Sequence, residues 1–203
     1  HLSLRRQRQM CIRDSFIADR QNTITEENLH QLYQISTGDY LPDEDRLLPD
    51  HFYRHDVVYV VDGEESREGL PAQQLPDAMK RLVDFANAKD GINELHKAAI
   101  LHFSFAYYHP YFDGNGRTAR LLHLWYLVQQ GYPAALFTPF SRYIAESKAA
   151  YYKAYDRVEK NALISGYTDV TPFLSYFCNE VYNRLQVDAA PCLLYTSDAA
   201  DEG

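Results

Sequence analysis

The residues best suited to do chemistry lie in one short stretch, His109 to Arg120, which reads HPYFDGNGRTAR. His109 is a good proton acceptor near neutral pH, because the ordinary pKa of imidazole lies close to that range. Asp113 offers carboxylate oxygens, the kind of ligand that Mg²⁺ prefers. A base and a metal ligand this close together indicate a site where a group is deprotonated beside a bound metal ion.

The glycines and arginines of the same stretch indicate an anion site. Gly114, Asn115 and Gly116 allow backbone conformations in which consecutive N–H groups converge on an anion. Arg117 and Arg120 are three residues apart, on one side of the helix expected to follow, and each can fork onto phosphate oxygens. The N–H groups at the start of that helix face the same space. The stretch therefore predicts a polyphosphate site.

Two apolar segments flank this stretch and are expected to position it. Residues 92–108 are almost continuously apolar, which predicts a helix buried on most sides. Residues 117–130 predict a second helix, ended by Gly131 and Pro133. Residues 110–117 are predicted to be the turn between them. The chemistry would thus sit on a connection held by two buried helices.

The rest of the pattern predicts an all-α, mainly helical bundle with one small β-hairpin. Residues 57–61 read VVYVV before Asp62-Gly63, which indicates a strand and a tight turn, with a return strand near 65–70. Residues 36–50, rich in polar residues and containing two prolines, are expected to be a loop. Further helices are predicted to start near Thr25, Pro76, Ser141 and Thr171, and the one from Ser141 is expected to run to about Lys160.

Composition excludes several classes of protein. The chain has 203 residues, with 20 Lys and Arg against 28 Asp and Glu, so its net charge of -8 argues against nucleic-acid binding by this domain. The sequence has no apolar run of about 18 residues and no secretion signal, so we expect no membrane span and a cytoplasmic location. Its three cysteines lack CxxC spacing and indicate neither a disulfide framework nor a zinc site.

The two ends of the chain differ from its middle. Residues 10–15 can be encoded by ATG TGT ATA AGA GAC AG, whose reverse complement, read one base over, encodes residues 192–196. One short oligonucleotide therefore accounts for both ends, and it resembles a transposase adapter used in sequencing libraries. We expect residues 1–15 and 192–203 to be foreign to the protein, and residues 16–191 to be one domain truncated at both ends.

The stretch HPYFDGNGRTAR resembles the signature of the Fic/Doc (Fido) family, HxFx(D/E)GNGRxxR. It departs from the usual pattern at Tyr111, where Phe is common, and we expect this aromatic ring to remain a packing anchor. The similarity extends over most of residues 23–160, through the lead-in ILHFSFAYY, the following LLHLWYLVQQGYP and the earlier hairpin. A motif with all its charged and glycine positions filled is a specific signal.

The resemblance implies a protein adenylyltransferase that moves AMP from ATP and Mg²⁺ to a Ser, Thr or Tyr hydroxyl of a target protein. His109 would be the catalytic general base and Asp113 would hold the metal. The remaining signature positions would bind the triphosphate of the nucleotide: Gly114, Asn115, Gly116, Arg117 and Arg120. The hairpin resembles the family's flap, which docks a target segment by strand addition, at Val60, Val61, Asp62 and Gly63.

Family members are often restrained by an inhibitory helix or an antitoxin, and the flanks of this chain leave both open. Residues 23–28, TITEEN, match the inhibitory pattern (S/T)xxxE(G/N) literally. We interpret these residues as a helix start instead, because a threonine followed by two glutamates makes a good N-terminal cap. The family's N-terminal inhibitory helix would lie further upstream.

Two alternatives to AMP transfer stay open. The same cradle suits transfer of another phosphate-containing group, as in a kinase-like Doc-type reaction. The other alternative is an inactive module that binds a nucleotide or a protein partner, although intact His109 and Asp113 count against it. The target protein and the oligomeric state do not follow from the sequence.

Overall fold

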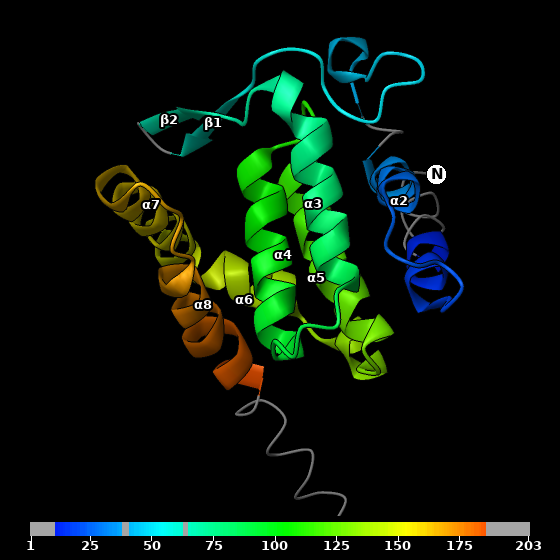
Figure 1. Cartoon of the computed structure of the whole chain (residues 1–203). Helices are drawn as coiled ribbons and strands as arrows, with labels where there is room; N and C mark the ends of the chain where they lie inside the picture. The colour runs from blue at the N-terminus through cyan, green and yellow to red at the C-terminus, as the bar shows by residue number, and fades with distance from the viewer. Residues whose placement is uncertain (1–10, 38–40, 63–64, 186–203) are drawn as a thin grey trace, which may run out of the picture. The chain divides into compact units, whose positions relative to one another are not determined.

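The computed structural model describes residues 11–37, 41–62 and 65–185. Within these residues the fold is mainly helical, with one two-stranded antiparallel sheet (Figure 1), which confirms the predicted fold class. The chain divides after Leu136 into two compact units. No described helix is both long and apolar enough to cross a membrane.

The first unit holds the helices that carry the signature. Residues 11–18 are helical, and short 3-10 turns cover Asp43–Asp45 and Ala72–Gln74, while a third, Pro133–Phe137, ends at the first residue of the second unit. In Figure 1 the helices α3, α4 and α5 lie side by side, and α2 packs against α3 and α5. The longer helices are α2 (Glu26–Thr37), α3 (Leu75–Asn87), α4 (Glu94–Tyr108) and α5 (Asn115–Gln129).

Helices α4 and α5 form the centre of this unit, as the continuous apolar pattern predicted. Leu101, Phe105, Leu122 and Trp125 have no exposed surface. Helix α4 begins at Glu94 rather than residue 92, because the side chain of Asn93 accepts hydrogen bonds from the first N–H groups of the helix and caps it. The turn that joins the two helices is therefore anchored at both ends in the core.

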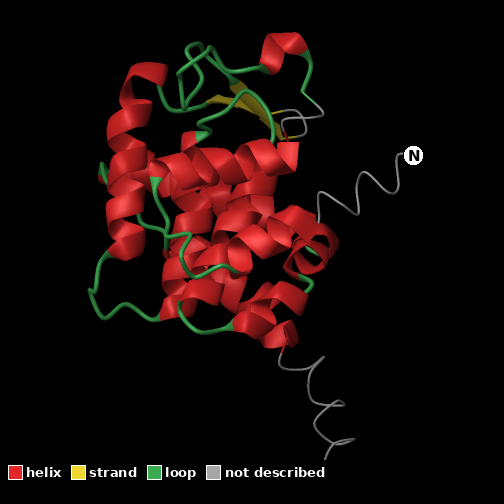
Figure 2. Ribbon diagram, turned by 90° about the vertical axis from the view of Figure 1, so that its right-hand side faces the viewer, coloured by secondary structure: helices red, strands yellow, loops and turns green. Residues whose placement is uncertain are grey.

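The hairpin forms as predicted, with slightly different limits. Strand β1 (Tyr59–Asp62) pairs antiparallel with β2 (Glu65–Glu68), and Val60 lies opposite Arg67. Figure 2 shows both strands, in yellow, near the top of the view. The hairpin lies at the C-terminus of α4, because the Arg67 guanidinium donates to the carbonyls of Ala106 at 3.4 Å and Tyr107 at 3.2 Å.

Helix α2 starts where the sequence predicted. The Thr25 hydroxyl accepts a hydrogen bond from the Asn28 N–H at 3.1 Å, which is the expected cap. The Tyr53 hydroxyl donates to the Glu26 carboxylate and ties the loop that follows α2 to its first turn. The helix continues to Thr37, into the segment expected to be a loop.

The second unit is helical and is described here by itself. It contains α6 (Phe140–Glu146), α7 (Lys148–Ser165), and α8 (Thr171–Tyr176), which continues as a π-helical turn, Phe177–Tyr182. The prediction of a single helix over residues 141–160 was wrong. The helix breaks at Ser147, whose hydroxyl donates to the Tyr143 carbonyl at 2.7 Å. An aromatic cluster joins α7 to α8: Tyr151, Tyr155, Phe173, Tyr176 and Phe177.

The ends expected to be foreign are only partly covered by the structure. Residues 192–203 and residues 1–10 lie outside the described residues. The helix over 11–18 begins inside the suspect segment, but its contact with the core comes from Phe16, whose ring centroid lies 5.6 Å from that of Trp125, and from the buried Ile17. The adapter origin of the ends stays a prediction.

Candidate active site at the start of α5

His109 ends α4 in a left-handed conformation, with φ 54° and ψ 59°. Among the described residues other than glycine, only Asp50 also has a positive φ. Such a conformation is uncommon for a side chain with a Cβ and is often found at functional sites. The backbone N–H of His109 still bonds the Phe105 carbonyl at 3.2 Å, so the residue is the last one tied to the helix.

The imidazole of His109 is oriented by the backbone of α4. Its Nδ1 lies 3.3 Å from the carbonyl oxygen of Ala106. Because a carbonyl oxygen only accepts, Nδ1 carries the proton in this contact, and Nε2 of the neutral ring is left as the acceptor. This is the tautomer that a general base at Nε2 requires.

The environment of His109 keeps its imidazole neutral. Burial, helped by the cationic side chains of Arg67 and Arg54, lowers its pKa from the ordinary value to about 4. The Ala106 carbonyl and the Asp113 carboxylate act in the opposite direction. At neutral pH the ring is therefore unprotonated and able to accept a proton.

Helix α5 begins at Asn115, two residues before the predicted start, so Asn115 and Gly116 belong to its first turn. Gly114 precedes it with a positive φ of 78°, a conformation that glycine adopts without strain. The carboxylate of Asp113 accepts a hydrogen bond from the Gly114 N–H at 2.6 Å. The predicted anion nest is thus the N-terminus of a helix, where N–H groups lack partners from a preceding turn.

Asn115 has a structural task that the sequence did not reveal. Its side chain, 2% exposed, accepts from the Tyr111 N–H at 2.9 Å and donates to the Tyr111 carbonyl at 2.7 Å. The amide therefore closes the turn after His109 and leaves only the backbone N–H of Asn115 for an anion. An asparagine near a helix start, four residues after the residue it binds, is the signal that could have suggested this.

Tyr111 is the packing anchor that was expected. Its side chain is fully buried, and its ring stacks on that of Tyr33 in α2, with centroids 3.6 Å apart. The N-terminal turn of α5 contacts the C-terminal end of α2. A Cβ on Gly114 would lie 2.7 Å from Cγ2 of Thr37, and Nη1 of Arg117 donates to the Ser36 carbonyl at 3.0 Å.

The two arginines predicted to bind phosphate both lie at the start of α5. Arg117 is exposed, and Nη1 of Arg120 lies 3.6 Å from the position that a Cβ on Gly116 would take. The charge of Arg120 also contributes to the lowered pKa of His102, after burial and His123. His102 and His123 are buried against each other with ring centroids 6.0 Å apart.

Arg54 is the residue beside His109 that sequence reasoning missed. Its side chain is 2% exposed, and its Nε donates to the carbonyl of His109 at 2.8 Å. The same guanidinium donates to the carbonyls of Asp56, at 2.6 Å, and Leu70. The flap residues Val60, Val61 and Asp62 lie in β1, just beyond this anchor, whereas Gly63 lies outside the described residues.

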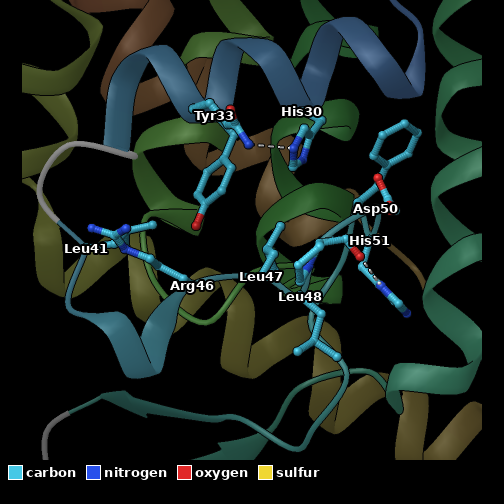
Figure 3. A pocket seen from close by; sticks show the side chains of 11 residues that line it. His30, Tyr33, Leu41, Arg46, Leu47, Leu48, Asp50 and His51 are labelled. Carbon is cyan, nitrogen blue, oxygen red and sulfur yellow. Dashed lines mark hydrogen bonds between the residues drawn. The ribbon is translucent and has the colours of Figure 1, made fainter.

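A cavity of about 610 Å³ lies between α2 and the loop over residues 41–52 (Figure 3). Tyr33 lines it, and its buried hydroxyl has no hydrogen-bond partner among the described residues. Burial, followed by the charges of Asp113 and Asp45, raises the pKa of Tyr33 to about 12. Because Tyr33 also stacks on Tyr111, one lining residue of the cavity contacts the turn that carries Asp113.

The described residues contain no group of three or more metal-ligating side chains. Mg²⁺ does not require one, since it often binds through one or two carboxylates together with phosphates and water. Asp113 fits that role: it is exposed, and one carboxylate oxygen is bonded to the Gly114 N–H at the helix N-terminus. The donor present is therefore compatible with Mg²⁺ brought in with a nucleotide.

A neutral imidazole, a carboxylate and a helix N-terminus lie at one end of a mainly helical unit, in the chain order that the Fic-type signature implies. The family profile described as Fic/DOC family matches residues 23–127, more than half of the chain. The chain belongs to the Fic/DOC family.

Relatives with this domain are longer proteins. The chain is 30% identical to protein adenylyltransferase fic-1 of Caenorhabditis elegans over 102 residues, which cover 49% of this chain and 18% of that protein. It is 36% identical to protein adenylyltransferase Fic of Nematostella vectensis over 87 residues, or 41% of this chain and 19% of that one. The chain thus matches less than a fifth of these relatives.

Solved structures confirm the fold. A Fic family protein from Desulfovibrio desulfuricans has a TM-score of 0.67 and 22% identity, covering 86% of this chain and 52% of that one. Fic-1 from C. elegans has a TM-score of 0.63 and 21% identity, covering 92% of this chain and 51% of that one.

Proposed function

We propose that the chain is the catalytic domain of a protein adenylyltransferase that moves AMP from ATP to a hydroxyl of a target protein. The observation that carries this proposal is the neutral His109 imidazole, with Nε2 available as acceptor, beside the N-terminus of α5. The similar proteins from C. elegans and N. vectensis are named protein adenylyltransferases, which supports the same reaction.

In the proposed reaction His109 Nε2 accepts the proton of a Ser, Thr or Tyr hydroxyl as its oxygen bonds to the α-phosphorus of ATP. The bond from the α-phosphorus to the oxygen bridging the β-phosphate breaks, and pyrophosphate leaves with that oxygen. The target keeps AMP in a phosphodiester. When bound at Asp113, Mg²⁺ would neutralise charge on the phosphates.

The chain's own residues would do most of the work by positioning and electrostatics. The N–H groups of Asn115 and Gly116 would bind phosphate oxygens at the positive end of the α5 dipole. Arg120 and Arg117 would neutralise charge on the β- and γ-phosphates. Arg117 would do so through the N–H donors that are not bonded to the Ser36 carbonyl. The hairpin would dock an extended target segment by strand addition, beside His109.

Labelled ATP separates AMP transfer from the two alternatives. The chain is incubated with Mg²⁺ and ATP labelled at the α- or the γ-phosphate, with lysate proteins and the chain itself as acceptors. We expect α label on protein, and none with His109→Ala. Label from the γ-phosphate would instead show a kinase, and nucleotide binding without label would show a binding module. Transfer that survives His109→Ala would overturn the role of His109.

A further inference from the structure

We propose that Arg54 is a positioning residue that locks the base of the hairpin to the backbone of His109, so that the docking strand and the catalytic imidazole hold one fixed relation. Its effect on activity rests on the proposed function, whereas the geometry does not. Arg54 precedes the hairpin by only a few residues, and its side chain turns back toward the end of α4.

One guanidinium joins three separate segments through their carbonyl oxygens. Nε binds His109 at 2.8 Å, Nη1 binds Asp56 at 2.6 Å, and Nη2 binds Leu70 at the end of the hairpin. The group is almost fully buried, so each of these bonds lies in a medium of low dielectric constant, where a lost partner is costly. Lysine carries the same charge but lacks the planar fork that reaches three acceptors.

The backbone on both sides of His109 is held by the same junction. The Arg54 N–H donates to the Pro110 carbonyl at 2.9 Å, immediately after His109. The Leu70 N–H donates to the Tyr108 carbonyl at 3.3 Å, immediately before it. Together with the Arg54 guanidinium, these bonds cover three consecutive carbonyls and fix the left-handed conformation of His109.

Gly69 shows how closely the hairpin base approaches this junction. A Cβ at Gly69 would lie 2.9 Å from Nη2 of Arg54, 3.0 Å from Cγ2 of Val58 and 3.3 Å from Cβ of His109. Any other residue there would push the strand away from Arg54 and His109. Gly69→Ala therefore disturbs the junction without removing a charge or a hydrogen-bonding side chain.

Arg67 supplies a matched control on the same hairpin. It also binds carbonyls at the end of α4, those of Ala106 and Tyr107, and its charge also faces His109. The charged groups that face the imidazole are Arg67, Arg54 and Asp113. Arg54→Gln and Arg67→Gln remove the same charge, but only the first removes the bond to the His109 carbonyl.

Amide hydrogen exchange and NMR of the labelled His109 imidazole test the junction in the whole chain, without a target. In Arg54→Gln we expect exchange at least tenfold faster at Leu70 and at the residue 54 amide, with shifted His109 signals, and unchanged exchange at Leu101 in the middle of α4. Arg67→Gln should leave the Leu70 and residue 54 amides protected. Wild-type exchange at both amides in Arg54→Gln overturns the proposal.

If the amides of Arg54→Gln lose their protection from exchange throughout the chain, Gly69→Ala provides the test of the junction. It should reproduce the local exchange and the His109 shift; unchanged values in Gly69→Ala would then overturn the proposal. Once an acceptor of α label is known, Arg54→Lys should lower kcat about tenfold or more while KM for ATP stays within about threefold, because small displacements of a catalytic group are costly. Failure of AMP transfer in the wild type rejects the proposed function but leaves the exchange result standing.

Discussion

The guanidinium of Arg117 donates to the carbonyl of Ser36 at 3.0 Å, so the last turn of α2 is tied to the first turn of α5. Thr37 lies against Gly114 at the same place. A residue expected to bind phosphate therefore also caps a helix C-terminus, where a cation is favoured by the helix dipole. The candidate phosphate site is therefore supported by the end of a helix that lies far away in the sequence.

Gly114→Ala is expected to destabilise the chain more than the same change at Gly91. Both glycines have a positive φ, 78° and 76°, so both substitutions add backbone strain of about 1 kcal/mol. Of the two, only Gly114 has a close neighbour for the new Cβ, with Thr37 Cγ2 at 2.7 Å, whereas a Cβ at Gly91 would meet nothing within 4 Å. Denaturant unfolding measures the difference, and Thr37→Ala in the Gly114→Ala background should recover part of it. Equal losses at the two glycines would contradict this close approach.

His109→Ala is expected to lower AMP transfer by about 10²- to 10⁴-fold, the usual contribution of a general base. ATP affinity should stay close to that of the wild type, because the N–H groups and arginines of α5 are untouched. Transfer of α label and calorimetric binding of ATP with Mg²⁺ measure the two effects. His96→Ala is the control, since His96 is exposed on the same helix and should leave both values unchanged.

Acid is expected to destabilise the fold partly through His109. Burial lowers its folded-state pKa from 6.5 to about 4, so between these values the unfolded chain binds more protons than the folded chain. The stabilising contribution is present above pH 6.5 and is lost as the pH falls toward 4. The thermal midpoint should therefore fall over this window, and less steeply in His109→Gln than in the wild type. Parallel curves for the two proteins would show that His109 is not the group responsible.

Asn115→Ala is expected to cost about 1 to 3 kcal/mol of stability, because both polar groups of the Tyr111 backbone lose their partner in a buried place. Transfer should fall as well, since the turn that carries Asp113 is no longer closed. Urea unfolding and α label transfer measure both effects. Asn161→Ala, at an exposed position on α7, is the control and should change neither.

The sequence predicted the elements better than the contacts between them. Helices α4 and α5, the hairpin and the cap at Thr25 follow from local patterns of apolar and capping residues, and all of them are present. The start of α5 and the break at Ser147 differ from the prediction, because each depends on a side chain that donates a hydrogen bond to a backbone carbonyl four residues away. Such bonds compete with helix geometry and leave little trace in hydrophobic periodicity.

In the candidate site, too, the sequence predicted individual residues better than the contacts between distant segments. His109 and Asp113 were predicted from their types and spacing, and the structure places both beside the N-terminus of α5. Arg54 was missed because it lies 55 residues before His109, and its partners are backbone carbonyls that carry no sequence signal. Contacts of this kind follow from the tertiary arrangement and not from a motif.

Tyr111→Phe is expected to raise stability by about 1 kcal/mol and to leave AMP transfer unchanged. The ring of Tyr111 packs on Tyr33, but its buried hydroxyl finds no hydrogen-bond partner among the described residues. Removing an unpaired buried hydroxyl while keeping the ring relieves a desolvation penalty. Tyr53→Phe is the opposite case and should lower stability by about 1 kcal/mol, because the Tyr53 hydroxyl donates to the Glu26 carboxylate. Urea unfolding of the two variants measures the contrast, and a loss of stability in Tyr111→Phe as large as in Tyr53→Phe would mean that the Tyr111 hydroxyl is bonded in solution.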